Sequence, residues 1–118
     1  MKLQIAASQL RLRLSEEELA LLTADGSFQH VMPCPDGSTA RCRLTLRAET
    51  DTGQCEGDLM DLQVILPHDA FLAFVAARPR RDGFAFFCGA LDITVDVDVR
   101  DSHRLRRTSA SSGKSTLD

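Results

Sequence analysis

Tryptophan and tyrosine are absent from this chain of 118 residues, and six phenylalanines are its only aromatic residues. Proteins that bind single-stranded nucleic acid stack bases on exposed aromatic rings, so this composition argues against that class. Long apolar runs are also missing, and none approaches the ~18 residues of a membrane-spanning helix. The opening segment "MKLQIAASQLRLRL" lacks the apolar core of roughly 7–15 residues that marks a secretory signal peptide. We therefore expect a cytoplasmic protein without membrane association.

Closely spaced cysteine pairs are missing as well. The four cysteines, Cys34, Cys42, Cys55 and Cys88, form no CxxC motif. In a chain without an export signal, reduced thiols are the default expectation.

Charge is distributed unevenly along the chain, although the net value is only −3. Residues 1–99 contain nine Lys/Arg and fifteen Asp/Glu, whereas residues 100–118 contain five Lys/Arg and two Asp. An acidic body disfavours nucleic-acid binding, because phosphate contacts need clustered cations. Residues 104–118 are rich in Arg, Ser and Thr and have little to bury. The expected organisation is a single domain over residues 1–103 and a disordered basic tail over 104–118.

The stretch "LRLRLSEEELALL" predicts a strand that leads directly into a helix. Leucine and arginine alternate from Leu10 to Leu14, which is typical of a half-buried strand. Ser15 and Glu18 have the spacing of a capping box, and Gly26 suits the left-handed position after a helix. We therefore expect a helix over about residues 15–24, and capping explains its three glutamates without a catalytic role.

Two hairpins and a further strand are predicted after this helix. Pro35-Asp36-Gly37 separates two alternating runs in a register that places His30 opposite Cys42. A third strand is expected from about residue 55 to 66, with Met60 on its inner face. A second helix is predicted to follow Pro67. A two-residue turn at Gly89-Ala90 then leads into the alternating segment "LDITVDVDVR".

Together these elements predict an α+β domain. Its expected architecture is a mostly antiparallel, strongly bent β-sheet with two short helices, in the order β-α-β-β-β-α-β-β. Residues 2–6, "KLQIA", are candidates for an additional first strand. The two halves of the chain follow a similar order of elements, although their residue identity is too low to identify a repeat.

The segment "MKLQIAASQLRLRLSEEELALL" resembles the start of a family of small uncharacterised bacterial proteins. Its members open with a basic and aliphatic strand, a short polar break, "RLRL" or "RFRL", and a Ser/Thr-capped helix. The resemblance extends over about the first 25 residues and is fainter at "LQVILPHDAFLAF" and in the closing strand. It implies a shared fold and a bacterial cytoplasmic setting. It implies no activity and transfers no functional residue.

Rows of charged side chains on the polar strand faces are the main candidate for chemistry. The arginines of the rows could bind phosphate groups, and the aspartates could bind a divalent cation. These residues are Arg11, Arg13, Arg41, Arg43 and Arg47 for the anion and Asp92, Asp96 and Asp98 for the metal. The segments "LRLRL", "RLTLR" and "ITVDVDV" are similar to strands of the triphosphate tunnel enzymes. The ExExK signature of that family is missing, because the matching segment here is "KLQIA". The alternative is a set of exposed cross-strand ion pairs on a wet face, each worth about 0.2–1 kcal/mol.

Two histidine-containing groups are weaker candidates. His30, Cys34 and Cys42 share one predicted face, but a zinc site needs four ligands with paired spacing. We interpret them as core residues. His68 and Asp69 begin the second helix, where the dipole already explains the carboxylate. No cofactor and no catalytic residue is predicted.

Two functional classes remain open at this point. The first is a non-catalytic domain that binds an unknown protein or small ligand, and a homodimer through a strand edge is one form of it. The second is a metal-dependent hydrolase that binds phosphate or triphosphate through the charged rows. The two classes differ in whether the Arg and Asp rows share one cavity.

Overall fold

The computed structural model describes residues 1–77 and 83–98, so the expected tail from residue 104 lies outside the described residues. The described part contains two helices and eight strands, and the predicted α+β class is confirmed. The elements in chain order are β1 (Lys2–Ala6), β2 (Gln9–Leu14), α1 (Glu16–Asp25), β3 (Ser27–Pro33), β4 (Thr39–Arg47), β5 (Gln54–Asp58), β6 (Asp61–Pro67), α2 (His68–Ala76), β7 (Phe84–Cys88) and β8 (Leu91–Val97).

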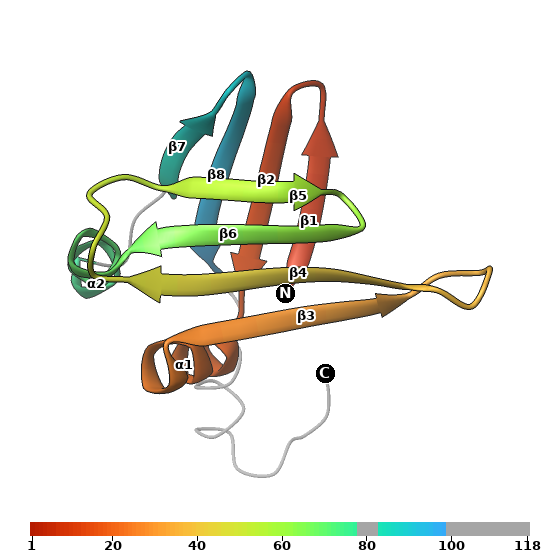
Figure 1. Cartoon of the computed structure of the whole chain (residues 1–118). Helices are drawn as coiled ribbons and strands as arrows, with labels where there is room; N and C mark the ends of the chain where they lie inside the picture. The colour runs from red at the N-terminus through yellow and green to blue at the C-terminus, as the bar shows by residue number, and fades with distance from the viewer. Residues whose placement is uncertain (78–82, 99–118) are drawn as a thin grey trace, which may run out of the picture.

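The strands form two four-stranded sheets that run across one another (Figure 1). Sheet A has the strand order β1-β2-β8-β7, and sheet B has the order β3-β4-β6-β5. The outer pairs of both sheets are antiparallel hairpins, whereas the central pairs β2/β8 and β4/β6 are parallel. Antiparallel pairing therefore predominates as predicted, but both sheets are mixed.

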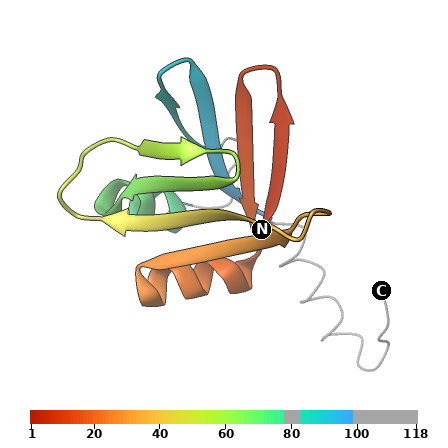
Figure 2. The same ribbon diagram turned by 45° about the vertical axis from the view of Figure 1, so that its right-hand side comes forward.

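The two halves of the chain have the same order of secondary-structure elements. Each half is a hairpin, a helix and a second hairpin, and each sheet takes one hairpin from each half. The counterparts in the two halves are β1 and β5, β2 and β6, β3 and β7, and β4 and β8. Exchanging each strand for its counterpart converts the strand order of sheet A into that of sheet B. In Figure 1, α1 lies beside β3, and α2 lies at the end of β6 on the same side of the molecule; Figure 2 shows α1 along β3 from a second side. This exchange of hairpins brings β2 and β8 together from opposite ends of the sequence.

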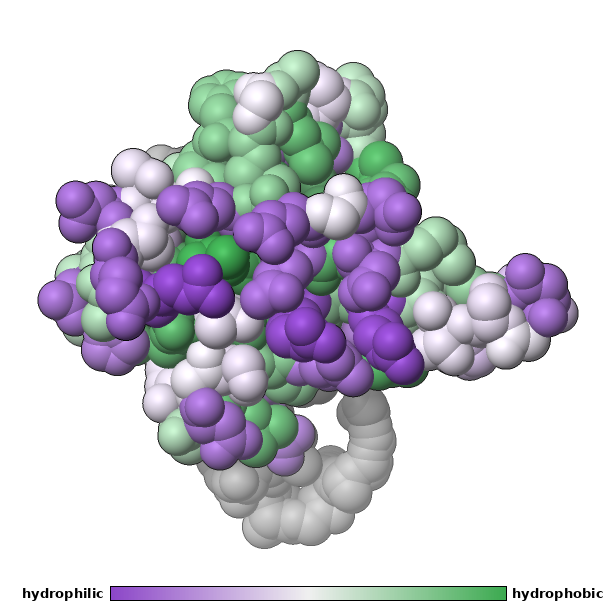
Figure 3. Space-filling view, in the orientation of Figure 1, coloured by the Kyte–Doolittle hydropathy of each residue, from purple (hydrophilic) through white to green (hydrophobic). Residues whose placement is uncertain are grey.

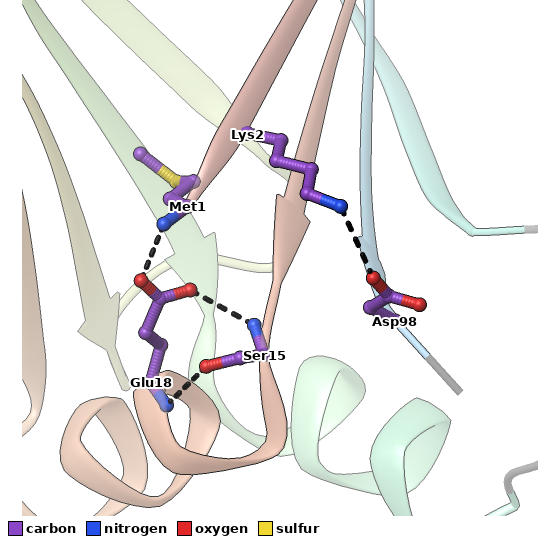
Figure 4. Close-up of polar contacts among 5 residues, drawn as sticks. All are labelled: Met1, Lys2, Ser15, Glu18 and Asp98. Atoms are coloured by element: carbon purple, nitrogen blue, oxygen red, sulfur yellow. Dashed lines mark hydrogen bonds and ion pairs between the residues drawn. The ribbon is translucent and has the colours of Figure 1, made fainter. Parts of the chain in front are cut away.

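Helix α1 begins and ends as the sequence predicts. The Ser15 hydroxyl accepts from the Glu18 backbone N–H at 3.1 Å, and the Glu18 carboxylate accepts from the Ser15 N–H at 2.8 Å. The same carboxylate contacts the Met1 amino group (Figure 4). Partial burial opposes ionisation, but the hydrogen bonds from Met1 and Ser15 hold the pKa of Glu18 below its ordinary value. Gly26 closes the helix with φ +80°.

The predicted hairpin geometry is confirmed, since His30 faces Cys42 between β3 and β4. The turn between β7 and β8 consists of Gly89 and Ala90, and Gly89 has a φ of +60°. A type II′ turn requires this positive φ at its first central position.

The prediction of one strand over residues 55–66 is wrong. The segment folds back as the β5/β6 hairpin, and Met60 lies in the turn with 48% of its surface exposed. The Asp58 carboxylate accepts hydrogen bonds from the backbone N–H groups of Met60 and Asp61, which closes the turn. Gly57 supplies a φ of +92° just before it. "EGD" was the sequence signal for this turn, because Gly and Asp favour such conformations.

The hydrophobic core lies between the two sheets and beneath the helices. Leucines of β2 contribute one wall and aliphatic residues of β4, β6 and β8 contribute the others. Phe71 and Phe74 of α2 pack against Phe84 of β7, with ring centroids 5.5 and 5.9 Å from the Phe84 ring. The fully buried residues of largest volume are Phe71, Leu10, Leu12, Leu14, Leu22, Leu44, Ile65, Leu66 and Ile93.

Candidate functional site

The charged row of sheet A converges on one carboxylate. The parallel register of β2 and β8 places Arg13 beside Asp96. Arg11 Nε donates to Asp96 Oδ2 at 2.9 Å, and Arg13 Nε lies 3.4 Å from Asp96 Oδ1. Asp96 is only 8% exposed. Two guanidinium groups therefore neutralise this nearly buried carboxylate.

The other two aspartates of the row do not share the two arginine contacts of Asp96. Asp92 faces Gln9 at the opposite end of the strand pair. The Asp98 carboxylate lies 3.5 Å from Lys2 Nζ, close to the start of β1 (Figure 4). In the described residues no group of three or more His, Cys, Asp or Glu side chains is arranged to hold a metal ion.

The remaining arginines belong to sheet B. Arg41, Arg43 and Arg47 lie on β4, whose alternate residues Cys42 and Leu44 face the core. Arg43 donates to the side-chain oxygens of Gln63 and Gln29 at 3.5 and 3.2 Å. Polar side chains cover this outer face of sheet B (Figure 3). The structure thus brings Arg11, Arg13 and Asp96 together on sheet A. The other three arginines of the predicted rows lie on sheet B.

The burial of Asp96 changes the expected effect of substituting it. The sequence predicts exposed ion pairs on a wet face, but this carboxylate is withdrawn from water between two arginines. We expect Asp96→Asn to lower the free energy of unfolding by about 1–3 kcal/mol, because two charge-assisted contacts lose their anion. The Arg11 and Arg13 side chains are 40% and 32% exposed, so water can solvate them in the variant. This solvation limits the loss of stability.

Urea denaturation at neutral pH measures this difference, and Arg43→Gln is the matched control. The Arg43 contacts are neutral amide contacts on a wet face, so this variant should change stability by less than about 1 kcal/mol. Equal effects of the two variants would show that the burial of Asp96 has no energetic consequence.

An apolar hollow of about 400 Å³ opens between β1 of sheet A and the hairpins of sheet B. Its lining comes from β1, from the β3/β4 hairpin and from the β5/β6 turn. Ile5, Met32 and Leu59 are 61%, 55% and 58% exposed, although each is a large hydrophobic side chain. Apolar surface also covers the hairpin ends of sheet A in Figure 3. The lining residues with large apolar side chains are Leu3, Ile5, Met32, Leu59 and Met60.

The proposed zinc candidates lie at this same hollow. His30, Cys34 and Cys42 all line it, and burial raises the pKa of the Cys42 thiol to about 11. Cys42 is buried in the core, as expected, whereas His30 and Cys34 are half-buried at the hollow. The alternation of "KLQIA" signalled that Leu3 and Ile5 share a face. The sequence carries no signal that this face remains open, because that depends on how the sheets cross.

Strand β1, one of the two edge strands of sheet A, borders the 400 Å³ hollow. Strand β1 pairs with β2 on one side, and no described strand pairs with its other side. All five of its residues are exposed. The backbone N–H and C=O groups of such an edge can accept an additional strand.

A second hollow of about 540 Å³ separates β5 from the β7/β8 hairpin. Cys55 of β5 and Cys88 of β7 both line it. Burial and the adjacent Cys88 thiol raise the pKa of Cys55 to about 12. Two thiols from different sheets therefore meet at this position.

Comparison of the chain with family models, with curated proteins and with solved structures finds no match. Neither helix of the described residues has the length and hydropathy that a membrane-spanning segment needs.

Proposed function

We propose that this chain is a non-catalytic cytoplasmic domain that binds an extended apolar segment of a partner protein. The observation that carries the proposal is the cluster of exposed hydrophobic side chains around the hollow between β1 and the hairpins of sheet B. Five large apolar residues from three separate chain segments surround one depression. Contiguous exposed apolar surface of this kind marks sites of interaction. The two methionines add flexible side chains that adapt to different partner residues.

The free edge of β1 supports an extended conformation for the partner segment. Leu3 and Ile5 line the hollow, and the register pairs the intervening Gln4 with Arg11 in sheet A. A strand that pairs with the free side of β1 would present every second side chain to the hollow. This is the geometry of strand addition, in which the backbone gives affinity and alternate side chains give specificity.

The character of the lining supports binding over catalysis. Most of the large side chains around the hollow are aliphatic or thioether groups, and His30 and Arg41 are the large polar ones. The apolar majority excludes water and packs against apolar atoms, which favours binding of an apolar segment. The charged groups Arg11, Arg13 and Asp96 lie instead on β2 and β8, where both arginines pair with the one carboxylate.

The test begins with selection of random twelve-residue peptides displayed on phage against the immobilised protein. We expect enrichment of sequences that alternate apolar and polar residues. Isothermal titration with a selected peptide should give micromolar affinity, and Ile5→Glu should weaken it at least tenfold. Gln4→Glu is the matched control, because it adds the same charge to the same strand at a position outside the hollow. It should change affinity less than twofold.

Three outcomes would contradict this proposal. The first is a selected peptide that binds Ile5→Glu and wild type equally well. The second is a concentration-dependent dimer that Ile5→Glu dissociates, since the hollow would then accept a second copy. The third is a saturable rise in melting temperature with triphosphate and magnesium that Arg43→Gln removes. That result would support the phosphate-binding hydrolase instead.

A further inference from the structure

We propose that Cys55 and Cys88 form a reversible disulfide that joins the two sheets at the edge away from β1 and β3. Strand β5 is one edge strand of sheet B, and β7 is the edge strand of sheet A opposite β1. A bond between them would link two sheets that no backbone pairing connects. It would also cross the 540 Å³ hollow that both cysteines line.

Close approach of the two chain segments begins just before the cysteines. A Cβ atom at Gly53 would lie 2.5 Å from the ring of Phe86, so only glycine permits the ring to occupy this place. Two residues further along each segment, Cys55 and Cys88 line the same hollow, and, besides burial, the Cys88 thiol is near enough to raise the pKa of the Cys55 thiol. Because side chains alternate along a strand, Cys88 lies on the same face of β7 as Phe86. The two thiols therefore lie next to the close approach of Gly53 and Phe86.

The surroundings favour a bond between these two thiols over other cysteine pairs. Both are only partly buried and border an open hollow, so a small oxidant reaches them. Cys34 and Cys42 line the other hollow, next to β1. All four are free thiols in this structure.

Hydrogen peroxide is the class of oxidant that we propose for the reaction. The Cys88 sulfur attacks one peroxide oxygen, the O–O bond breaks, and Cys88 becomes a sulfenic acid with release of water. The Cys55 sulfur then attacks the sulfur of that sulfenic acid. The S–O bond breaks, hydroxide leaves with the Cys55 proton as a second water, and the disulfide forms.

The experiment treats the reduced full-length protein with a small excess of hydrogen peroxide, then unfolds it in urea and blocks the remaining thiols with iodoacetamide. Intact-mass measurement should show the loss of two hydrogens and alkylation of only two cysteines. Peptide mapping should recover a cross-linked pair that contains Cys55 and Cys88. The melting temperature should rise by more than about 5 °C, because the bond restricts the unfolded chain, and dithiothreitol should reverse the rise.

Cys55→Ser should abolish both the cross-link and the thermal shift, whereas Cys34→Ser, the matched control, should keep both. Three results on the wild-type protein alone would overturn the proposal, independently of how the variants fold. They are full alkylation of Cys55 and Cys88 after peroxide, over-oxidation of Cys88 to the sulfinic acid without a cross-link, or a disulfide that contains Cys34 or Cys42.

Discussion

Replacing Phe71 by alanine should lower the free energy of unfolding by about 3–5 kcal/mol, the range for deleting a buried aromatic ring. Phe71 is 0% exposed and has the largest volume among the fully buried side chains. Its ring meets Phe84 edge-on at 5.5 Å and Phe74 at 5.8 Å. Because α2 spans only nine residues, the helix depends on this anchor more than on its own propensity.

Urea denaturation monitored by circular dichroism measures the effect of Phe71→Ala. Phe87→Ala is the control, because the Phe87 ring is 70% exposed on the neighbouring strand and buries little area. It should change stability by less than about 1 kcal/mol. A small effect of Phe71→Ala would mean that α2 docks through other residues.

Gly57→Ala should lower the free energy of unfolding by about 3 kcal/mol or more, because backbone strain and a steric clash of the added Cβ atom act together. Gly57 has φ +92°, a conformation that costs an L-residue about 1–3 kcal/mol. A Cβ atom there would also lie 2.2 Å from the backbone carbonyl oxygen of Asp61, which cannot move without disturbing β6. The β5/β6 turn would have to shift, and Leu59 and Met60 would move away from the hollow with it.

Gly37→Ala is the matched control for this substitution. Gly37 has nearly the same φ, +91°, but a Cβ atom there would meet nothing within 4 Å. It should therefore cost only the backbone strain, about 1–2 kcal/mol. The difference between the two variants in urea denaturation isolates the collision at Asp61. If both variants lose the same free energy of unfolding, the β5/β6 turn relaxes around the added Cβ atom without a further energetic cost.

Local rules were enough to predict most of the individual elements of this protein. The Ser15–Glu18 capping box, the Gly26 helix end and the facing of His30 and Cys42 involve residues close in sequence. Hydrogen-bond geometry and φ preferences act over this short range, so the residue types alone determine the outcome. The error at Met60 came from following apolar alternation through "EGD", where glycine and aspartate should have indicated a turn.

Only the tertiary structure decided which hairpins share a sheet, because the chain exchanges hairpins between its halves. Strands β2 and β8 are far apart in sequence, and their alternating patterns would equally suit an antiparallel partner. Parallel pairing places Asp96 beside Arg13, which turns a predicted surface charge into a nearly buried one. The crossing of the sheets leaves the face with Leu3 and Ile5 open and brings Cys55 to Cys88. The burial of a side chain and its long-range contacts depend on how the helices and strands pack against one another. Residue spacing along one strand carries no information about that packing.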